Sequence, residues 1–287
     1  MAKMEAFTFM AALLSVGLSA VLYLWRVALL RREKVAVGVG ASSAVAEPRY
    51  SFWDPGRFAI MLAVSGLVFL TFSIVARWIT TGHGPFSNMY EYNLVTAWGT
   101  VAATLYAQWR YRTPLISAVV MPIAVALLIW GYTIPSRALP LVPALQQSLL
   151  LTIHVSVAMI ASGFFAVSFG AAVLNLIQRR GNLAWLPPVA VLDDLGYRGV
   201  IVGFPFWTLM IILGALWADI AWGRYWGWDP KETASLVTWF IYAGYAHART
   251  VRGWKGAKGD SLLIIGFGAV VFTYLGNFFF TGLHAYT

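Results

Sequence analysis

Residues 200–220, VIVGFPFWTLMIILGALWADI, form an apolar run in which Asp219 is the one charged residue. A helix of about 20 such residues crosses the roughly 30 Å hydrocarbon core of a lipid bilayer. Backbone groups in lipid must find their hydrogen-bond partners within the segment, so the run predicts a helix rather than a strand. Further runs of the same kind occupy 7–29, 57–79, 91–109, 115–132, 148–177, 233–249 and 261–281. The sequence therefore predicts an all-α polytopic membrane protein with about eight transmembrane helices.

The distribution of charge predicts how these helices are oriented. Of the 287 residues, 60% are hydrophobic and 11% are charged, whereas about 25% of a soluble domain is charged. Fifteen of the 20 lysines and arginines lie in or beside the connections that follow the first, third, fifth and seventh runs. The positive-inside rule makes that side cytoplasmic and places both termini on the external (periplasmic) side. Topology thus accounts for the net charge of +9, which we do not attribute to nucleic-acid binding.

The chain divides into two predicted units. Residues 1–56 hold the first transmembrane helix and a cytoplasmic linker, whose glycines, alanines and serines are typical of flexible connections. Residues 57–287 form a membrane domain that carries an external loop at 222–233. The chain contains no cysteine, which excludes a thiolate metal site, a cysteine nucleophile and a disulfide within it.

The external loop, WGRYWGWDPKET, concentrates aromatic side chains beside charged ones. It holds Trp222, Trp226, Trp228 and Asp229 within a few positions. Tryptophan favours the membrane–water interface, so an interfacial aromatic belt is one interpretation. The alternating glycines would also let the backbone approach a flat apolar ligand, for which aromatic faces supply contact area. The loop by itself leaves both interpretations open.

The four histidines favour the ligand interpretation. His83, His154 and His284 lie at the predicted external side, and His247 lies near the cytoplasmic end of the run 233–249. Ionisable groups in membrane spans are costly and mark functional sites by default. Neutral imidazole is an axial ligand of haem iron, so a haem against the tryptophans between His154 and His284 is a coherent picture. Each histidine alone is also compatible with an ordinary polar role.

Residues 222–254, WGRYWGWDPKETASLVTWFIYAGYAHARTVRGW, resemble the WWD family of haem-handling proteins of cytochrome c maturation. Within that family the chain is most similar to the CcsA (ResC) type. The similarity extends, in the order of that family, to RWITTGHGPFSNMYEYN at 77–93, HVSVAMIASGFF at 154–165 and GFGAVVFTYLGNFFFTGLHAY at 266–286.

The resemblance implies a role for each site residue. His154 and His284 would ligate the iron of haem b on the external side, and His247 would hold haem on its way across the membrane. The residues that would cradle the haem are Trp222, Trp226, Trp228 and Asp229. We expect Asp229 and Glu232 to cap the following helix as well. Lys231 and Arg224 are candidate partners of the haem propionates, and His83 is expected to structure its loop.

The resemblance also implies the activity and its setting. The protein would be the haem-binding subunit of a system II cytochrome c synthase, a holocytochrome c haem-lyase of the bacterial inner (plasma) membrane. Thioether bonds would join haem b to the two thiols of CXXCH apocytochromes, with no residue of this chain as a catalytic acid or base. The implied partners are a ResB (CcsB)-type membrane subunit and thiol-reducing proteins. A CcmC-like haem exporter or loader without synthase activity remains the alternative.

Overall fold

The computed structural model describes residues 2–37, 54–136, 141, 143–146, 148–280 and 282. These residues form eight α-helices and two short 3-10 turns, without a β-strand. The helices are α1 (Ala2–Val37), α2 (Pro55–Thr81), α3 (Met89–Tyr111), α4 (Ser117–Thr133), α5 (Ser148–Gly181), α6 (Val189–Trp222), α7 (Pro230–Val251) and α8 (Ala257–Phe279); the turns are η1 (Pro114–Ile116) and η2 (Pro143–Gln146). Each predicted run overlaps one α-helix over nearly all of its length, so the all-α fold class is confirmed. Most of the predicted linker, residues 38–53, lies outside the described residues.

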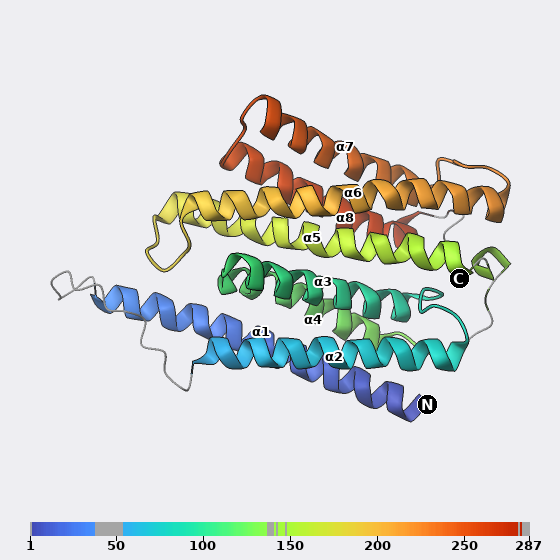
Figure 1. Cartoon of the computed structure of the whole chain (residues 1–287), viewed down its shortest axis with the longest axis horizontal. Helices are drawn as coiled ribbons and strands as arrows, with labels where there is room; N and C mark the ends of the chain where they lie inside the picture. The colour runs from blue at the N-terminus through green and yellow to red at the C-terminus, as the bar shows by residue number, and fades with distance from the viewer. Residues whose placement is uncertain are drawn as a thin grey trace.

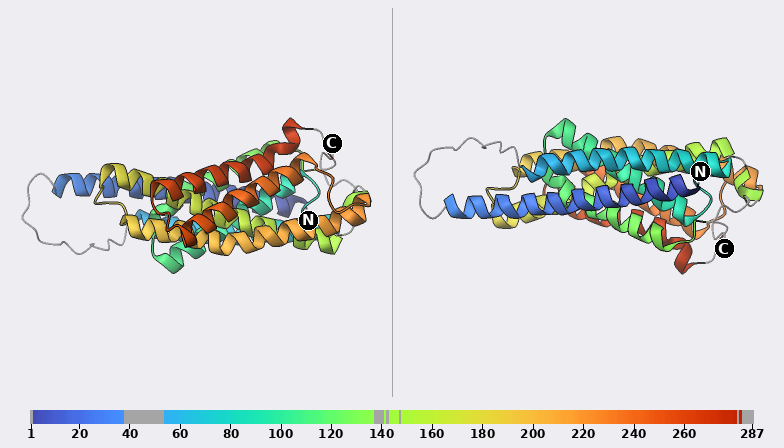
Figure 2. Two further views of the ribbon diagram at one scale, coloured as in Figure 1. Left: turned by 90° about the horizontal axis from the view of Figure 1, so that it is seen from above. Right: turned by 90° about the horizontal axis from the view of Figure 1, so that it is seen from below.

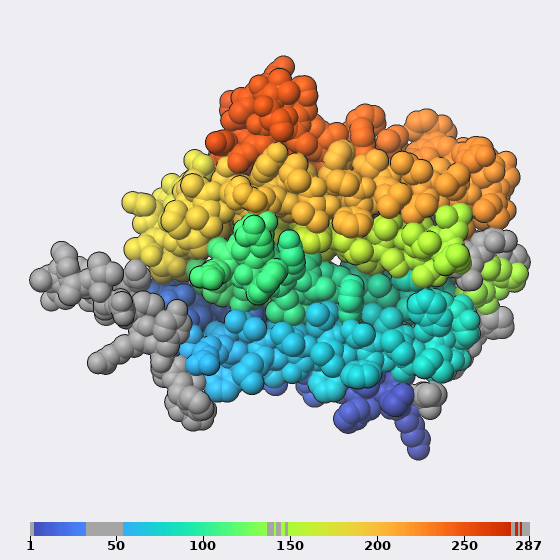
Figure 3. All heavy atoms as spheres, viewed as in Figure 1, coloured from blue at the N-terminus to red at the C-terminus, as the bar shows by residue number. Residues whose placement is uncertain are grey.

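The helices run roughly parallel to one long axis and form two groups (Figure 1). α1 packs against α2 and α4 in one group, while α5 packs against α6 and α8 in the other; α3 joins the groups through its contact with α5. On the face seen in Figure 3, α2 and α6 form two long surface ridges with part of α3 between them. The two groups thus meet along α3 and α5.

The connections alternate between the two ends of the bundle. Residues 82–88 and 223–229 lie at the end where α1 begins, whereas 182–188 and 252–256 lie at the other (Figure 2). We call residues 222–229 the Trp loop and its side of the bundle the Trp-loop end. This alternation agrees with the predicted topology.

Six helices among the described residues are long and apolar enough to cross a membrane: α1, α2, α4 with η1, α5, α6 and α8. α3 and α7 have the length but are more polar. In α3 the polar residues are buried, among them Asn93, Thr96, Thr100 and Thr104. Because these side chains face other helices instead of lipid, α3 does not need an apolar surface all round. A multi-pass membrane protein remains the architecture.

Small residues bring α3 and α5 into close contact. A Cβ atom on Gly99 would lie 2.8 Å from the carbonyl oxygen of Met159, and one on Gly163 would overlap the carbonyl oxygen of Gly99. Membrane helices commonly use glycine in this way to bring their backbones together. This close packing of α3 against α5 joins the two groups of helices.

A buried ionic network holds the first group together at the Trp-loop end. The Arg77 Nε atom lies 2.7 Å from Glu91 Oε1, and its Nη1 atom lies 3.4 Å from Glu5 Oε1. The second Glu91 oxygen accepts hydrogen bonds from the backbone N–H and the hydroxyl of Ser87 at 2.7 and 2.8 Å. Asn88 caps α3 by accepting from the Glu91 backbone N–H at 3.0 Å. These contacts fix the connection 82–88 over the end of the bundle.

Candidate functional site

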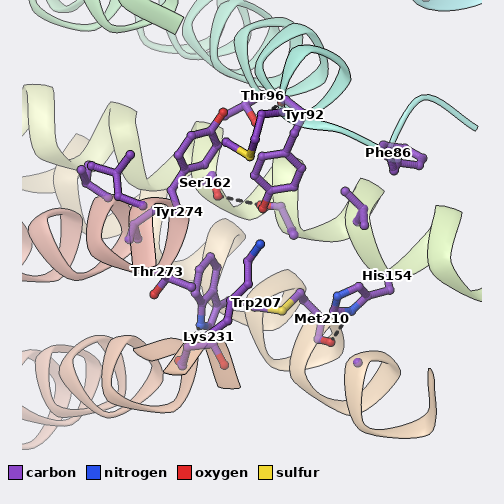
Figure 4. A pocket seen from close by; sticks show the side chains of 18 of the residues that line it. Phe86, Tyr92, Thr96, His154, Ser162, Trp207, Met210, Lys231, Thr273 and Tyr274 are labelled. Carbon is purple, nitrogen blue, oxygen red and sulfur yellow. Dashed lines mark hydrogen bonds between the residues drawn. The ribbon is translucent and has the colours of Figure 1, made fainter. Parts of the chain in front are cut away.

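A cavity of about 490 Å³ lies between the two groups of helices, beneath the Trp loop (Figure 4). Its wall follows α5 from Leu151 to Ala166, about 22 Å at 1.5 Å per residue. The other walls come from α3, α4, α6, α7 and α8, and the aromatic lining residues include Tyr92, Trp207 and Tyr274. Small-molecule sites typically measure about 300–1,000 Å³ and are lined mostly by apolar and aromatic groups. The cavity therefore has the size and lining of a site for a large apolar ligand.

His154 lines this cavity in a defined orientation. Its Nδ1 atom lies 2.8 Å from the backbone carbonyl oxygen of Met210 in α6. A carbonyl oxygen only accepts, so Nδ1 carries the proton and Nε2 carries the lone pair. A histidine held in this way by a backbone carbonyl is oriented for metal ligation through its other nitrogen. The absence of a side chain on Gly214 makes the position possible, because a Cβ atom there would lie 2.7 Å from His154 Cε1.

The tryptophans around His154 occupy different environments. Trp217 of α6 lies nearly parallel to the imidazole, with ring centroids 6.4 Å apart, and Trp222 meets Trp217 edge-on at 4.7 Å. Trp226 lines the cavity, and its buried indole N–H has no acceptor among the described residues. Trp228 packs edge-on against Trp226 at 5.9 Å but is 69% exposed. The Trp loop thus turns Trp226 inward and Trp228 outward.

The acidic residues after the tryptophans hold the loop in this shape. Asp229 Oδ1 accepts from the Lys231 backbone N–H at 2.9 Å. Glu232 Oε2 accepts from the backbone N–H groups of Asp229 and Gly227 at 3.1 and 2.8 Å. This is a capping box at the start of α7, so the prediction that both acids cap the helix is confirmed. Trp228 precedes the cap with a left-handed φ of 55°, a conformation that the two hydrogen bonds of Glu232 around it help to maintain.

Lys231 brings a positive charge into the cavity from the first turn of α7, ahead of the predicted span. Its half-buried side chain lines the cavity, and Nζ lies 5.0 Å from the ring centroid of Tyr92. Burial lowers the pKa of the Lys231 ammonium to about 8, and the negative charge of Asp229 opposes this shift only in part. No carboxylate of the described residues forms an ion pair with it.

The other histidines lie apart from this cavity or outside the described residues. His247 lies on an exposed face of α7 near the end opposite the Trp loop and does not line the cavity. His83 contacts the backbone of its own connection, with Nδ1 2.8 Å from the Gly84 carbonyl oxygen, as expected of a loop-structuring residue. His284 lies outside the described residues. Gly282 is described, and a Cβ atom there would overlap the Asp229 carboxylate.

The structure thus brings His154, Trp222, Trp226 and Asp229 to one end of the bundle and leaves His247 at the other. The sequence analysis missed the cavity wall, notably Tyr92, Trp207, Met210 and Tyr274. These residues lie within apolar runs on three helices, α3, α6 and α8, and nothing in a run distinguishes a cavity-facing residue from a lipid-facing one.

Comparison with known proteins identifies the family. The model of the cytochrome C assembly protein family matches residues 86–284, a range that contains every residue lining the cavity. The chain belongs to this family. It is 36% identical over 280 residues to the cytochrome c biogenesis protein CcsA of Prochlorococcus marinus (strain NATL2A), covering 82% of this chain and 88% of that one. The CcsA of the alga Porphyra purpurea is 34% identical over 292 residues, covering 85% and 91%.

A solved structure shows that the fold also occurs in a larger protein. The protein named cytochrome c haem lyase CcmF superposes with a TM-score of 0.63 at 17% sequence identity. The match covers 93% of this chain and 47% of CcmF, so the chain spans about half the length of that protein. At this identity the likeness shows a shared fold. The family membership itself rests on the sequence comparisons, which support a role in cytochrome c biogenesis.

Proposed function

We propose that this protein is the haem-binding membrane subunit of a system II cytochrome c synthase. It presents haem b at the Trp loop for thioether attachment to CXXCH apocytochromes. The observation that carries the proposal is His154: its tautomer is set by the Met210 carbonyl, and it lies on an aromatic cavity directly beneath the Trp loop. Family membership supplies the biological context.

The residues around the cavity suit a haem. Haem is a flat, largely apolar ring system with two carboxylates, and the cavity offers aromatic walls and about 490 Å³ of space. His154 supplies an imidazole whose Nδ1–H is held by the Met210 carbonyl oxygen, so that the neutral ring carries its lone pair on Nε2. The buried indole N–H of Trp226 and the ammonium of Lys231 supply donors for polar groups of the ligand. The site therefore combines an axial ligand, flat apolar walls and polar anchors.

Within this proposal His154 and His284 are the external axial ligands, Trp222, Trp226 and Trp228 contribute aromatic surface, and Asp229 holds the loop. Support for His284 comes from Gly282, which lies against Asp229 and Pro230. His284 follows two residues later, a span of at most about 7 Å of extended chain. This part of the chain is thus close enough to the Trp loop to deliver a ligand there.

Thioether formation depends mainly on how haem and the cysteine thiols are positioned relative to each other. In each thioether bond a cysteine sulfur joins one vinyl carbon of haem and a proton is added to the other, with no net oxidation or reduction. The chain has no cysteine, so both sulfur atoms come from the apocytochrome. Holding the ring rigidly while the peptide docks raises the effective concentration of the reacting groups, which is the contribution we assign to the cavity and the Trp loop.

We assign His247 to a separate haem contact at the opposite end, which we take to be cytoplasmic. His247 is exposed on α7, and a single histidine provides one axial ligand, so a second ligand would come from a ResB-type partner. The Trp-loop end and both termini would be periplasmic in a bacterial inner membrane. Thiol-reducing proteins would keep the CXXCH cysteines available. Residues 57–287 then act as the haem-handling unit.

The test is the absorption spectrum of the protein purified with its partner from haem-replete cells. We expect a bis-histidine spectrum in the wild type, and we expect His154→Ala/His284→Ala to lose the external haem while His247→Ala retains it. Transfer of haem to a CXXCH peptide in covalent form, resistant to acidified solvent, then distinguishes a synthase from a CcmC-like loader. A wild-type complex that contains no haem would contradict the proposal. The tryptophans would then be interpreted as an aromatic belt at the membrane–water interface.

A further inference from the structure

Two hydrogen-bond donors face the cavity without an acceptor. The Lys231 ammonium lies over the Tyr92 ring and forms no ion pair with the described residues. The indole N–H of Trp226 is buried and has no acceptor among them. Both side chains line the same cavity. An unpaired buried donor such as the Trp226 N–H costs free energy, whereas the Lys231 side chain is half-buried.

The acid that lines the cavity is already engaged. Glu232 directs Oε2 to the backbone N–H groups of Gly227 and Asp229, at 2.8 and 3.1 Å. Its hydrogen bonds stabilise the loop and do not neutralise Lys231. The two donors therefore have the chemistry to receive an acceptor from a ligand, and a carboxylate suits both kinds of donor because it carries negative charge and two oxygens.

We propose that Lys231 and Trp226 bind a carboxylate of the ligand and thereby fix which edge of haem faces the substrate. The inference rests on the proposed function. Haem b carries both propionates on one edge, and its two vinyl groups lie away from that edge. Figure 4 shows the Lys231 side chain reaching into the cavity toward Tyr92. Trp226 belongs to the Trp loop and Lys231 follows that loop in the first turn of α7, so a propionate held by both directs the vinyl edge away from these two side chains.

The assignment distinguishes Lys231 from the other cation of this region. Arg224 lies in the Trp loop, is exposed, and does not line the cavity. Its guanidinium lies over Gly227, where a Cβ atom would come within 3.0 Å of Nε. The sequence offered Lys231 as a candidate partner of the propionates, with Arg224 as an additional one. The geometry favours Lys231 and makes Arg224 the matched control.

The experiment compares the binding of haem and haem dimethyl ester, in which both carboxylates are masked, to the full chain purified with its partner. We expect the wild type to bind haem at least tenfold more tightly than the ester. In Lys231→Met this preference should fall to less than threefold, while the axial-histidine spectrum is kept. Trp226→Phe, which removes the N–H and keeps a ring, should weaken the preference severalfold. Lys231→Arg and Arg224→Met should retain it.

The outcomes separate this inference from the proposed function. A wild type that binds both compounds equally well overturns the carboxylate site and leaves the haem site intact. A preference lost in Arg224→Met but kept in Lys231→Met overturns the assignment to Lys231. If Lys231→Met weakens both compounds equally, the lysine is structural and the inference fails. A wild type that binds neither compound contradicts the proposed function itself.

Discussion

Gly214 controls how much room the His154 imidazole has against α6. A methyl group at this position would lie 2.7 Å from His154 Cε1, so Gly214→Ala should push the ring away from the Met210 carbonyl oxygen. We expect the haem content to fall about tenfold and the free energy of unfolding to decrease by about 1–3 kcal/mol, because the added methyl group overpacks the site. Gly244→Ala in α7, where no atom lies within 4 Å of the added methyl group, is the control. Equal haem content in the two variants would contradict this account of His154.

The Lys231 ammonium makes the carboxylate preference depend on pH. Its pKa in the free protein is about 8, and a bound carboxylate raises it. The ratio of the affinities for haem and its ester therefore has its full value below pH 8. It falls as the pH rises from 8 toward the higher pKa that Lys231 has in the bound state. Tyr92, Asp229, Glu232 and His154 are the other titratable groups that face or neighbour this lysine.

Affinities of haem and its ester measured between pH 6.5 and 10 test this prediction. Affinity for the ester, which needs no ammonium, should change little over the alkaline part of the range. Lys231→Met should have no alkaline loss of preference, because methionine does not titrate. A wild-type preference that increases above pH 8 would have the wrong sign and would contradict the ammonium–carboxylate contact.

At the scale of single elements, the N-terminus of α7 depends on its capping box. Asp229→Ala removes the acceptor of the Lys231 backbone N–H and should cost about 1 kcal/mol, while Asp229→Asn keeps an oxygen and should cost little. We expect the haem content to decrease with the free energy of unfolding, so that Asp229→Ala contains less haem than Asp229→Asn. Thermal unfolding and haem content of the purified complex measure both. An asparagine variant as damaged as the alanine variant would show that Asp229 acts through its charge, in contact with the ligand or a partner group.

The opposite end of α7 is held by a different contact. Arg249 Nη2 lies 2.6 Å from Asp193 Oδ2 in the first turns of α6, and Asp193 Oδ1 accepts from the Gly256 backbone N–H at 3.0 Å. Arg249 follows His247 by two residues, so this pair fixes the part of α7 that presents His247. Asp193→Ala should lower stability by about 2 kcal/mol and reduce haem bound at His247, but not at His154.

The neighbouring acid provides the control for this prediction. Asp194 pairs with Arg198 at 2.6 Å, but both side chains are about half exposed, so Asp194→Ala should change stability by less than about 0.5 kcal/mol. Absorption spectra recorded in a His154→Ala/His284→Ala background isolate the His247 signal. An unchanged signal in Asp193→Ala would mean that the pair does not position His247.

At the scale of the whole molecule, apolar runs predicted the helices well and the site only in part. The run 200–220 lies within α6, but α6 begins at Val189, and its first turns form ion pairs through Asp193 and Asp194 that hydropathy does not register. His154 and the tryptophans could be predicted because they stand out chemically from their surroundings. Tyr92 and Tyr274 could not, because their role depends on α3 and α8 meeting across a cavity, where their rings lie 4.9 Å apart.

The integrity of the bundle at the Trp-loop end rests on the buried network of Arg77, Glu91 and Glu5, whose residues are at most 5% exposed. Glu91 is the stronger partner, at 2.7 Å against 3.4 Å for Glu5, and it also holds Ser87. Glu91→Gln leaves Arg77 with the longer contact to Glu5 as its ion pair and weakens the charge-assisted hydrogen bonds to Arg77 and Ser87. It should therefore cost about 2–3 kcal/mol.

Glu5→Gln should cost less, because Arg77 keeps its shorter contact with Glu91. Both variants leave the residues of the cavity wall unchanged, but Glu91 is adjacent in sequence to Tyr92, which lines the cavity. We therefore expect Glu91→Gln to lose both thermal stability and haem, and Glu5→Gln to lose mainly stability. Thermal unfolding and haem content of the two purified complexes decide this. If Glu91→Gln loses stability but keeps its full haem content, the network holds the first group of helices together without positioning the wall that α3 contributes to the cavity.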